Sequence, residues 1–140
     1  MDIEEIKKAI ELRYPYLLVD RVLELNGDEL VARKNVTINE PFFQGHFPEP
    51  GPSVMPGTMI IESMAQVSGI LAQSNIGGFG VGYLVGVDGA RFRQKVTPGD
   101  QLVLKARLER ARTNLCKVSV EGYVDEELVA EAKITLAFDE

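Results

Sequence analysis

The longest apolar segment of the chain lies between Pro56 and Ser74. Apolar or small side chains recur there on nearly every side of a helical projection, and polar ones are few. Proline suits the first turn of a helix, because its ring fixes φ near the helical value and its missing N–H would have no partner there. The segment therefore predicts a helix that is buried on almost all sides, with Gly77 suited to a position just beyond its end.

Alternating or β-rich runs lie on both sides of this predicted helix. Residues 17–25 and 29–37 form one pair, joined by Asn26-Gly27-Asp28, a strong hairpin signal. Four runs with short turn sequences between them follow the helix, at 81–96, 101–111, 115–124 and 127–138. The last run alternates most clearly, with apolar side chains at Leu128, Ala130, Ala132, Ile134, Leu136 and Phe138.

These elements predict an α+β fold, in which an antiparallel sheet of about six strands wraps one long buried helix. A short amphipathic helix over residues 3–12 is expected to pack at the edge of this fold. At 140 residues, the chain is long enough for one core and short for two, so residues 1–140 are expected to form a single domain. One small sheet cannot cover such a helix completely, so the protein is expected to be a homo-oligomer built from dimers.

Composition and charge exclude several classes of function. Fifteen basic and twenty-one acidic residues give a net charge of −6, which repels nucleic acid. The N-terminus lacks the pattern of a secretory signal and no apolar segment is long enough to span a membrane, so we expect a cytoplasmic protein without membrane association. The single cysteine, Cys116, lies in an alternating run, which favours a small core side chain over a nucleophile.

Two titratable side chains near the predicted helix are candidates for chemistry. His46, the only histidine, follows a glycine that lets the backbone approach another group closely and precedes a proline that stiffens the chain two residues later. Glu62 lies about one turn into the helix, where an ionised carboxylate is costly unless it is paired, hydrogen-bonded or protonated. Each also has a structural explanation: His46 as a hydrogen-bonded structural side chain, and Glu62 as a first-turn acid favoured by the helix dipole.

Several motifs are similar to those of one enzyme family. They are Gly45-His46-Phe47-Pro48, Met55-Pro56-Gly57, Glu62-Ser63-Met64-Ala65-Gln66, Arg91-Phe92-Arg93 and Pro98-Gly99-Asp100, with Arg13-Tyr14-Pro15 and Leu17-Leu18-Val19-Asp20-Arg21 near the start. With these motifs the chain resembles, over nearly its whole length, the FabZ-type 3-hydroxyacyl-[acyl-carrier-protein] dehydratases. The sister FabA-type enzymes usually have aspartate at the position of Glu62, which favours the FabZ type.

The resemblance implies a hot-dog fold, in which two subunits join their sheets and dimers commonly assemble as trimers. It implies dehydration of (3R)-3-hydroxyacyl-[acyl-carrier-protein] to the trans-2-enoyl product in type II fatty-acid biosynthesis, with the acyl chain on a phosphopantetheine arm. His46 of one subunit and Glu62 of the other would be catalytic. Substrate contacts are expected at four further residues: Phe47, Pro56, Gly57 and Tyr83. From the strand pattern alone, Tyr83 is just as well interpreted as an aromatic residue of the core.

This reaction needs a base that removes a proton from C2 and an acid that protonates the hydroxyl leaving C3. Histidine, with an ordinary pKa of about 6.5, suits the base, and a carboxyl group in apolar surroundings can stay protonated and donate. The N–H of Gly57, at the helix start, can stabilise charge on the thioester carbonyl. No cofactor is required, and a lone histidine without clustered cysteines or acids is a poor metal site.

Two groups of charged residues allow alternative interpretations. Arg91, Arg93 and Lys95 alternate along a predicted strand and therefore share one face. That face is either an ordinary solvated surface or the docking patch for carrier-protein acids and the phosphopantetheine phosphate, which an acidic partner would need on this acidic chain. Asp20 and Arg21 form either a catalytic pair or, as we favour, a structural ion pair.

The chain departs from the family pattern at two places. Residues 49–54 make the loop between Pro48 and Met55 two residues longer than is usual, and Leu12 replaces a frequent histidine. Surface loops tolerate added length, but this loop sets the geometry of the catalytic candidates. Two other functions therefore stay open: a non-catalytic acyl-thioester binding module of the same fold, and a hot-dog thioesterase, which generally lacks the histidine–glutamate combination.

Overall fold

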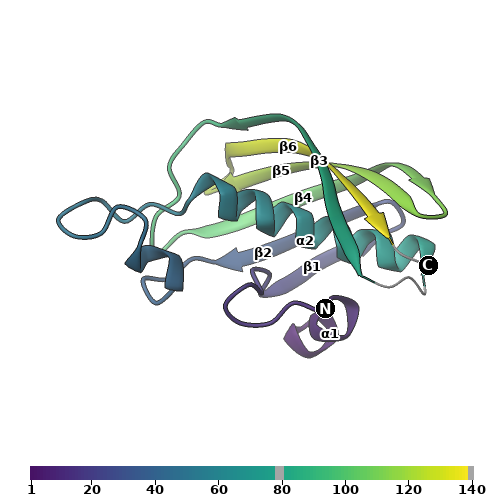
Figure 1. Ribbon diagram of the computed structural model, residues 1–140, viewed down its shortest axis with the longest axis horizontal. Helices are drawn as coiled ribbons and strands as arrows, with labels where there is room; N and C mark the ends of the chain where they lie inside the picture. The colour runs from purple at the N-terminus through teal and green to yellow at the C-terminus, as the bar shows by residue number, and fades with distance from the viewer. Residues whose placement is uncertain (78–80, 139–140) are drawn as a thin grey trace.

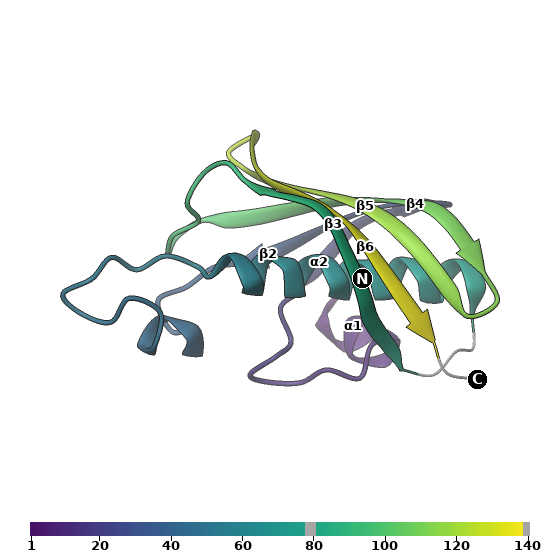
Figure 2. The ribbon, with the colours of Figure 1, turned by 45° about the horizontal axis from the view of Figure 1, so that its top comes forward.

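The computed structural model describes residues 1–77 and 81–138. Its main feature is a curved antiparallel sheet that faces one long helix, α2 (Gly57–Ile76), as Figures 1 and 2 show. The strands are β1 (Arg21–Asn26), β2 (Glu29–Asn35), β3 (Gly82–Phe92), β4 (Gln101–Arg112), β5 (Leu115–Val124) and β6 (Glu127–Phe138). Two short helices, α1 (Ile3–Ala9) and the 3-10 helix η1 (Pro41–Gln44), complete the described elements. The predicted α+β architecture is confirmed.

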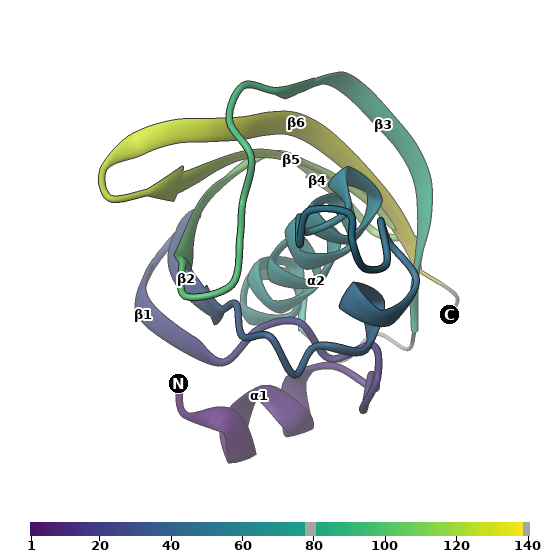
Figure 3. The same ribbon diagram turned by 90° about the vertical axis from the view of Figure 1, so that its left-hand side faces the viewer.

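The order of the six strands determines which of them are sheet edges. They lie in the order β1-β2-β4-β5-β6-β3, and every neighbouring pair is antiparallel. Viewed end-on, the sheet curls around α2 from β1 on one side to β3 on the other, with α1 near the open side (Figure 3). The first hairpin therefore lies at one edge of the sheet, and β3 lies at the other.

The core lies between the concave face of the sheet and α2. Nine residues of α2 are buried: Ile60, Ser63, Met64, Gln66, Val67, Ser68, Ile70, Leu71 and Ala72. The buried side chains of the central strands include Leu102, Leu104, Val118, Val120, Ile134 and Leu136. Because burying one such leucine or valine contributes about 1.5–3 kcal/mol, this contact is sufficient to hold α2 against the sheet. Within residues 1–77 and 81–138, no helix combines the length and apolar character needed to span a membrane.

The alternation predicted for the last strand is confirmed over most of its length. Every second side chain from Ala130 to Phe138 is buried, whereas Leu128 is only half-buried. The register between β5 and β6 shifts between Gly122 and Tyr123, opposite this point, and the neighbouring Val129 is buried instead. A bulge therefore changes which face the first residues of the strand present.

The first helix is shorter than predicted. α1 ends at Ala9, and the backbone of Ile10 is already extended. The guanidinium group of Arg13 donates hydrogen bonds to the carbonyl oxygens of Lys7 and Ile10. Carbonyl groups at a helix end lack intrahelical partners, so a long basic side chain that folds back can terminate the helix here.

Three strands are also shorter than predicted, and β2 is the least affected, because it ends at Asn35 and not at residue 37. β1 begins at Arg21, because the backbone of residues 16–18 is hydrogen-bonded to the α2 side chains Ser63 and Gln66 and not to a strand. β3 ends at Phe92, after its register with β6 has shifted twice. The predicted basic face of Arg91, Arg93 and Lys95 therefore extends beyond the end of the strand.

Among the described residues, exposed large apolar side chains are concentrated along β3. None of the exposed large hydrophobic side chains belongs to α2. Six of them lie on β3 or directly before it: Val81, Tyr83, Leu84, Val85, Val87 and Phe92. The expectation that one chain would leave part of α2 uncovered holds only in part, because nine residues of α2 are buried whereas Met59, Ile61 and Ile76 are partly buried. Edge strand β3 gives a different reason to expect a dimer.

Candidate active site

The segment that carries His46 connects η1 to α2 and projects beyond the N-terminal end of α2 (Figure 2). The backbone N–H of His46 donates to the carbonyl oxygen of Phe42 at 3.0 Å, which extends the turn of η1. Phe47 then has φ of 55°, a left-handed conformation that costs a non-glycine residue about 1–3 kcal/mol. This turn brings the ring of Phe47, which is exposed, against the half-buried His46 ring, with the centroids 4.1 Å apart.

The hydrogen bond of the His46 ring selects its tautomer. Nδ1 lies 2.7 Å from the carbonyl oxygen of Val54. A carbonyl oxygen can only accept, so Nδ1 must carry the proton and donate it. In the neutral ring, Nε2 then keeps its lone pair and can accept a proton from a substrate. The ring is therefore oriented as a general base would have to be.

The longer loop before α2 is folded around this contact. A Cβ atom on Gly51 would lie 2.8 Å from the carbonyl oxygen of Phe47, so the close turn of the loop requires glycine at that position. At the end of the loop, the backbone N–H of Met55 donates to the carbonyl oxygen of Val96 at 2.8 Å. This bond fixes the backbone next to Val54, the partner of His46. The loop that contains the added residues thus supplies, at Val54, the acceptor for the His46 ring.

Glu62 is half-buried and lies in the second turn of α2. The helix begins at Gly57 and has no acidic residue in its first turn, so the explanation of Glu62 as a first-turn acid is wrong. Its Oε2 accepts a hydrogen bond from Nε2 of Gln66 at 2.9 Å. These two residues are four apart, a spacing that brings side chains together on one helix face.

Gln66 is itself held in one orientation, and this determines how Glu62 can act. The backbone N–H of Leu18 donates to Oε1 of Gln66 at 2.8 Å, so Nε2 is the donor end, and it also donates to the carbonyl oxygen of Tyr16. Because Gln66 donates to Oε2 of Glu62, a proton on this carboxyl group would be on Oε1. Gln66 was predicted only as part of a motif, although its spacing of four residues from Glu62 was a usable signal.

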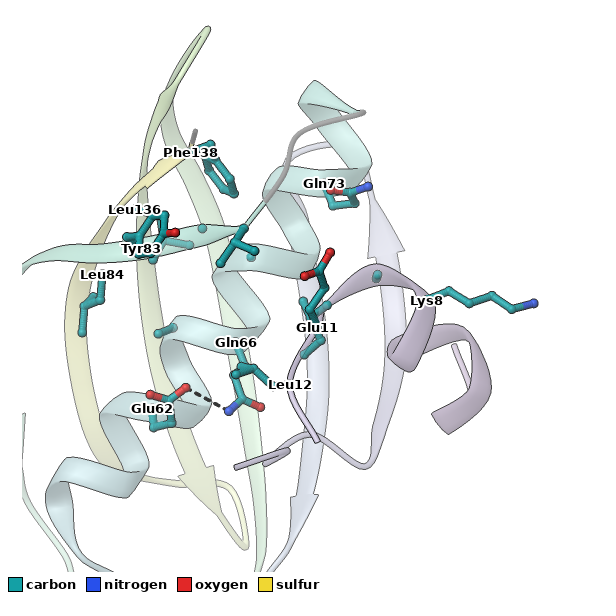
Figure 4. Close-up of a pocket in the computed structure, with 16 residues that line it drawn as sticks. Lys8, Glu11, Leu12, Glu62, Gln66, Gln73, Tyr83, Leu84, Leu136 and Phe138 are labelled. Carbon is teal, nitrogen blue, oxygen red and sulfur yellow. Dashed lines mark hydrogen bonds between the residues drawn. The ribbon is translucent and has the colours of Figure 1, made fainter. Parts of the chain in front are cut away.

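A cavity of about 450 Å³ lies beside Glu62. Its walls come from the helix α2, from the end of α1 and the segment that follows it, and from β3 and the end of β6 (Figure 4). They include Glu62, Ala65, Gln66, Gly69, Gln73, Leu12, Tyr83, Leu84, Leu136 and Phe138. Tyr83 is 51% exposed, so its interpretation as a core aromatic is wrong for this chain, and it shares the cavity with Glu62.

One chain brings together only part of the predicted site. Glu62 and Tyr83 line the cavity, whereas His46 and its neighbour Phe47 are not among its walls. Pro56 and Gly57 are also outside the walls, at the start of α2. The base and the acid that the sequence predicted thus do not share this cavity within one chain.

The start of α2 offers backbone donors. Pro56 caps the helix without a side-chain hydrogen bond, and within the described residues the N–H groups of Gly57 and Thr58 have no acceptor. The ring of Phe92 would lie 3.1 Å from a Cβ atom on Gly57, so glycine also makes room for this aromatic side chain. Free N–H groups at the positive end of a helix are suited to stabilising an oxyanion.

The three basic candidates do not form one continuous strand face. Arg91 lies in β3, but the strand ends at Phe92, so the prediction that Lys95 alternates along it is wrong. Arg93 is already engaged, with its guanidinium group 3.2 Å from the carboxylate of Glu131. All three basic side chains are exposed.

Two other predicted assignments are resolved by contacts. Asp20 has a structural role, as favoured, but its partner is not Arg21: its carboxylate lies 3.5 Å from Nζ of Lys34 and accepts the N–H of Asn35 at 2.7 Å. Cys116 is fully buried, and burial raises the pKa of its thiol. A buried thiol is a poor nucleophile, so its assignment as a core residue is confirmed.

Residues 11–133 match the FabA-like domain family. The dehydratase FabZ of Syntrophobacter fumaroxidans, a 3-hydroxyacyl-[acyl-carrier-protein] dehydratase, is 52% identical over 136 residues, which cover 96% of this chain and 91% of that protein. The FabZ of Streptococcus equi subsp. zooepidemicus is 48% identical and covers 99% of this chain and 98% of its own. Among solved structures, the dehydratase heterocomplex ApeI:P from Xenorhabdus doucetiae aligns with a TM-score of 0.81 at 15% identity, covering 96% of this chain and 91% of that one.

The structural similarity confirms the predicted hot-dog fold. A protein bound to acetyl CoA from Streptococcus mutans has the same architecture, with a TM-score of 0.70 at 17% identity and coverage of 92% and 94%, so the fold alone does not identify an activity. The sequence matches are more specific. This chain belongs to the FabZ-type 3-hydroxyacyl-[acyl-carrier-protein] dehydratases of the FabA-like family, which confirms the resemblance found in its motifs and its assignment to a class of hydro-lyases.

Proposed function

We propose that this protein dehydrates (3R)-3-hydroxyacyl-[acyl-carrier-protein] to trans-2-enoyl-[acyl-carrier-protein] in type II fatty-acid biosynthesis, as a single domain in the cytoplasm. Its family membership supports this reaction. The observation that carries the proposal is the 2.7 Å hydrogen bond from Nδ1 of His46 to the Val54 carbonyl oxygen. It fixes the ring and, in its neutral form, leaves the lone pair on Nε2, as removal of a C2 proton requires.

In the proposed mechanism, two protein groups act on adjacent carbons of the substrate. Nε2 of His46 takes the proton from C2, and electrons move into the C2–C3 bond as the C3–O bond breaks. Glu62 gives the proton on Oε1 to the leaving hydroxyl, so that water departs. The N–H groups of Gly57 and Thr58 donate to the thioester oxygen as it gains negative charge. Phe47, Pro56 and Tyr83 contact the acyl-pantetheine chain.

The same mechanism requires two subunits. His46 is not on the wall of its own chain's Glu62 cavity, so the proposed site combines His46 of one subunit with Glu62 of its partner. The proposed reaction uses only two side chains and backbone N–H groups, so it needs no added cofactor. We infer a homodimer as the minimal unit and a trimer of dimers as its assembly.

An absorbance assay with a crotonyl thioester tests the function. We expect reversible hydration of the enoyl double bond, because a base and an acid that catalyse elimination also catalyse the reverse addition. A loss of enoyl absorbance without release of thiol would support the dehydratase. Tight binding without turnover would instead identify a binding module, and release of free thiol would identify a thioesterase.

Carrier-protein docking makes a separate prediction. Arg91 and Lys95 are exposed, and within the described residues neither forms an ion pair. Charge reversal at both should lower kcat/KM for an acyl-carrier substrate by at least about tenfold and leave a small thioester unaffected, because only the carrier has an acidic surface. Rising salt should reduce the difference, since screening weakens exposed charge pairs.

Arg112 provides the matched control for this patch. It is exposed and basic, but strand register places it at the end of the sheet opposite Arg91. Reversal of Arg112 should leave both substrates unchanged. Equal losses on the two substrates after reversal of Arg91 and Lys95 would show that these residues do not act in docking.

A further inference from the structure

Lys34 occupies a position on β2 where the strand pattern calls for an apolar side chain. It alternates with the buried residues Leu30 and Ala32, so it points to the concave face of the sheet that also faces the core. It is only 5% exposed. A buried lysine must be paired, because an isolated ammonium group is very costly to remove from water.

Two carboxylates pair with Lys34, and one of them belongs to the segment that leads to His46. Nζ lies 3.1 Å from Oε1 of Glu40 and 3.5 Å from Oδ2 of Asp20. The other oxygen of Glu40, Oε2, accepts the backbone N–H of Thr37 at 3.0 Å and its hydroxyl at 3.3 Å. Glu40, whose side chain is 12% exposed, is thus held by the sheet on one oxygen and by its own turn on the other.

Glu40 transmits this anchor to His46 through η1. It is the N-cap residue of that helix, but its side chain makes no capping bond and instead returns to Lys34 and Thr37. Its carbonyl oxygen accepts the N–H of Phe43 at 3.1 Å, which starts η1, and the N–H of His46 bonds to that helix at its other end. Through these bonds a lysine on β2 fixes the start of the loop that carries the histidine.

A simple contribution to stability explains this arrangement poorly. A buried ion pair gains little net free energy, because the loss of hydration offsets most of the attraction, and an apolar side chain would fit the strand pattern. Geometry is a better explanation: Phe43 anchors η1 in the core, and a turn of four residues needs further fixed contacts, such as those of Glu40, to hold one orientation on that anchor. Phe43 is the only buried residue of η1.

We infer that Lys34 is a positioning residue for the dehydration reaction: through Glu40 and η1, it holds the His46 ring in the place where Nδ1 meets the Val54 carbonyl. This inference rests on the proposed role of His46 as the base. A displacement near 1 Å can lower the rate of a proton transfer about a hundredfold, so loss of this anchor should be visible in kcat.

The experiment uses Lys34→Met and Glu40→Ala in the full-length protein. We expect each to lower kcat by at least about tenfold with KM for the small thioester within about twofold, because the base is misplaced while the binding cavity is untouched. His46 is the only histidine, so an imidazole nitrogen NMR spectrum contains one ring. The parent protein should show Nδ1 protonated, and the variants should show a mixture of tautomers.

Two controls separate positioning from general stability. The ion pair between Arg107 and Glu29 also joins β2 to another element, at 2.6 Å, but it is exposed and at the other end of that strand. Arg107→Met should change neither kcat nor the tautomer. Asp20→Asn removes the second partner of Lys34 while keeping an oxygen for the Asn35 N–H, and should also leave the tautomer unchanged.

The outcomes distinguish this inference from the proposed function. If Lys34→Met fails to fold, Glu40→Ala decides the question, since it leaves Lys34 paired with Asp20. An unchanged tautomer and a kcat within about twofold of the parent in a folded variant would overturn the positioning role. A parent protein without dehydratase turnover would overturn the proposed function, whereas the NMR comparison would still test whether Lys34 orients the ring.

Discussion

Replacing His46 with alanine or Glu62 with glutamine should each lower dehydratase turnover by at least about a hundredfold, because each change removes one partner in proton transfer. The alanine variant loses the Nε2 base, and the glutamine variant keeps the size of Glu62 but cannot release a proton from Oε1. Turnover of a crotonyl thioester under saturating conditions measures the effect. Glu109→Gln, an exposed carboxylate change on β4, is the matched control and should retain full activity.

The two changes should not be additive. If His46 and Glu62 act on adjacent carbons in one concerted unit, the double variant should be scarcely slower than the slower single variant. Unchanged thermal unfolding and unchanged mass in solution would show that fold and assembly persist. Near-normal turnover of His46→Ala would contradict the mechanism and favour the acyl-thioester binding module.

Mixing the two inactive variants tests the division of the site between subunits. Of the two sites in a mixed dimer, one contains both an intact His46 and an intact Glu62, so part of the activity should return after dissociation and reassembly. Differently tagged chains would prove that mixed dimers form. Mixed dimers without activity would show that both groups come from the same subunit.

Local sequence predicted the strands best where turn residues and alternation agree. β5 and β6 have the boundaries that their alternating runs predicted, since short turns separate them and neighbouring strands bury every second residue. α1 ended early because Arg13 reaches back to its last carbonyl groups. β1 started late because residues 16–18 bind α2, about fifty positions away in the chain. No window of local sequence contains the α2 partners of residues 16–18.

The candidate site was also predictable only in part from the sequence. His46 and Glu62 were identified because each is an unusual residue type in its context and lies in a family motif. Their orientation was not predictable, because the partner of the His46 ring is a backbone carbonyl group, which any residue could supply at that position. Lys34 was overlooked because an ordinary solvated lysine and a buried one look the same until the strand faces are known.

The two edges of the sheet differ in a way that indicates how the chain associates. At one edge, β1 spans only six residues and is protected by the N-terminus, since Val22 donates its N–H to the Met1 carbonyl and accepts the Met1 amino group. β3, at the other edge, has eleven residues and bears exposed apolar side chains. Long apolar edge strands invite pairing with another strand, whereas short or covered ones resist it. β3 is therefore the edge suited to a partner.

Some side chains of β3 continue the concave, core-facing surface of the sheet but remain exposed in the single chain. Leu84 is paired with Leu136 and Val87 with Ile134, and both partners are buried on the concave face. Leu84 and Val87 face the same way but are 45% and 39% exposed, because residues 1–77 and 81–138 of one chain do not cover them fully. A second copy with its own β3 against this edge would cover the same side chains on both subunits, as a two-fold interface requires.

We therefore expect Val85→Lys combined with Val87→Lys to convert the protein to a monomer. The added charges of both subunits would lie close together along the β3–β3 contact, where like charges in an apolar interface are strongly unfavourable. Neither residue lines the Glu62 cavity, so the change does not alter the proposed binding surface directly. Light scattering at micromolar concentration measures the mass, and the crotonyl assay measures turnover.

Activity should fall with the dimer, by at least about a hundredfold, because separated subunits no longer combine His46 with Glu62 in one site. Leu23→Lys, a change of the same kind at an exposed leucine on β1, should leave both mass and turnover unchanged. If the β3 variant keeps the mass of the parent, another surface forms the interface. A stable monomer with full turnover would contradict the shared site as well, since the base and the acid would then have to meet within one chain.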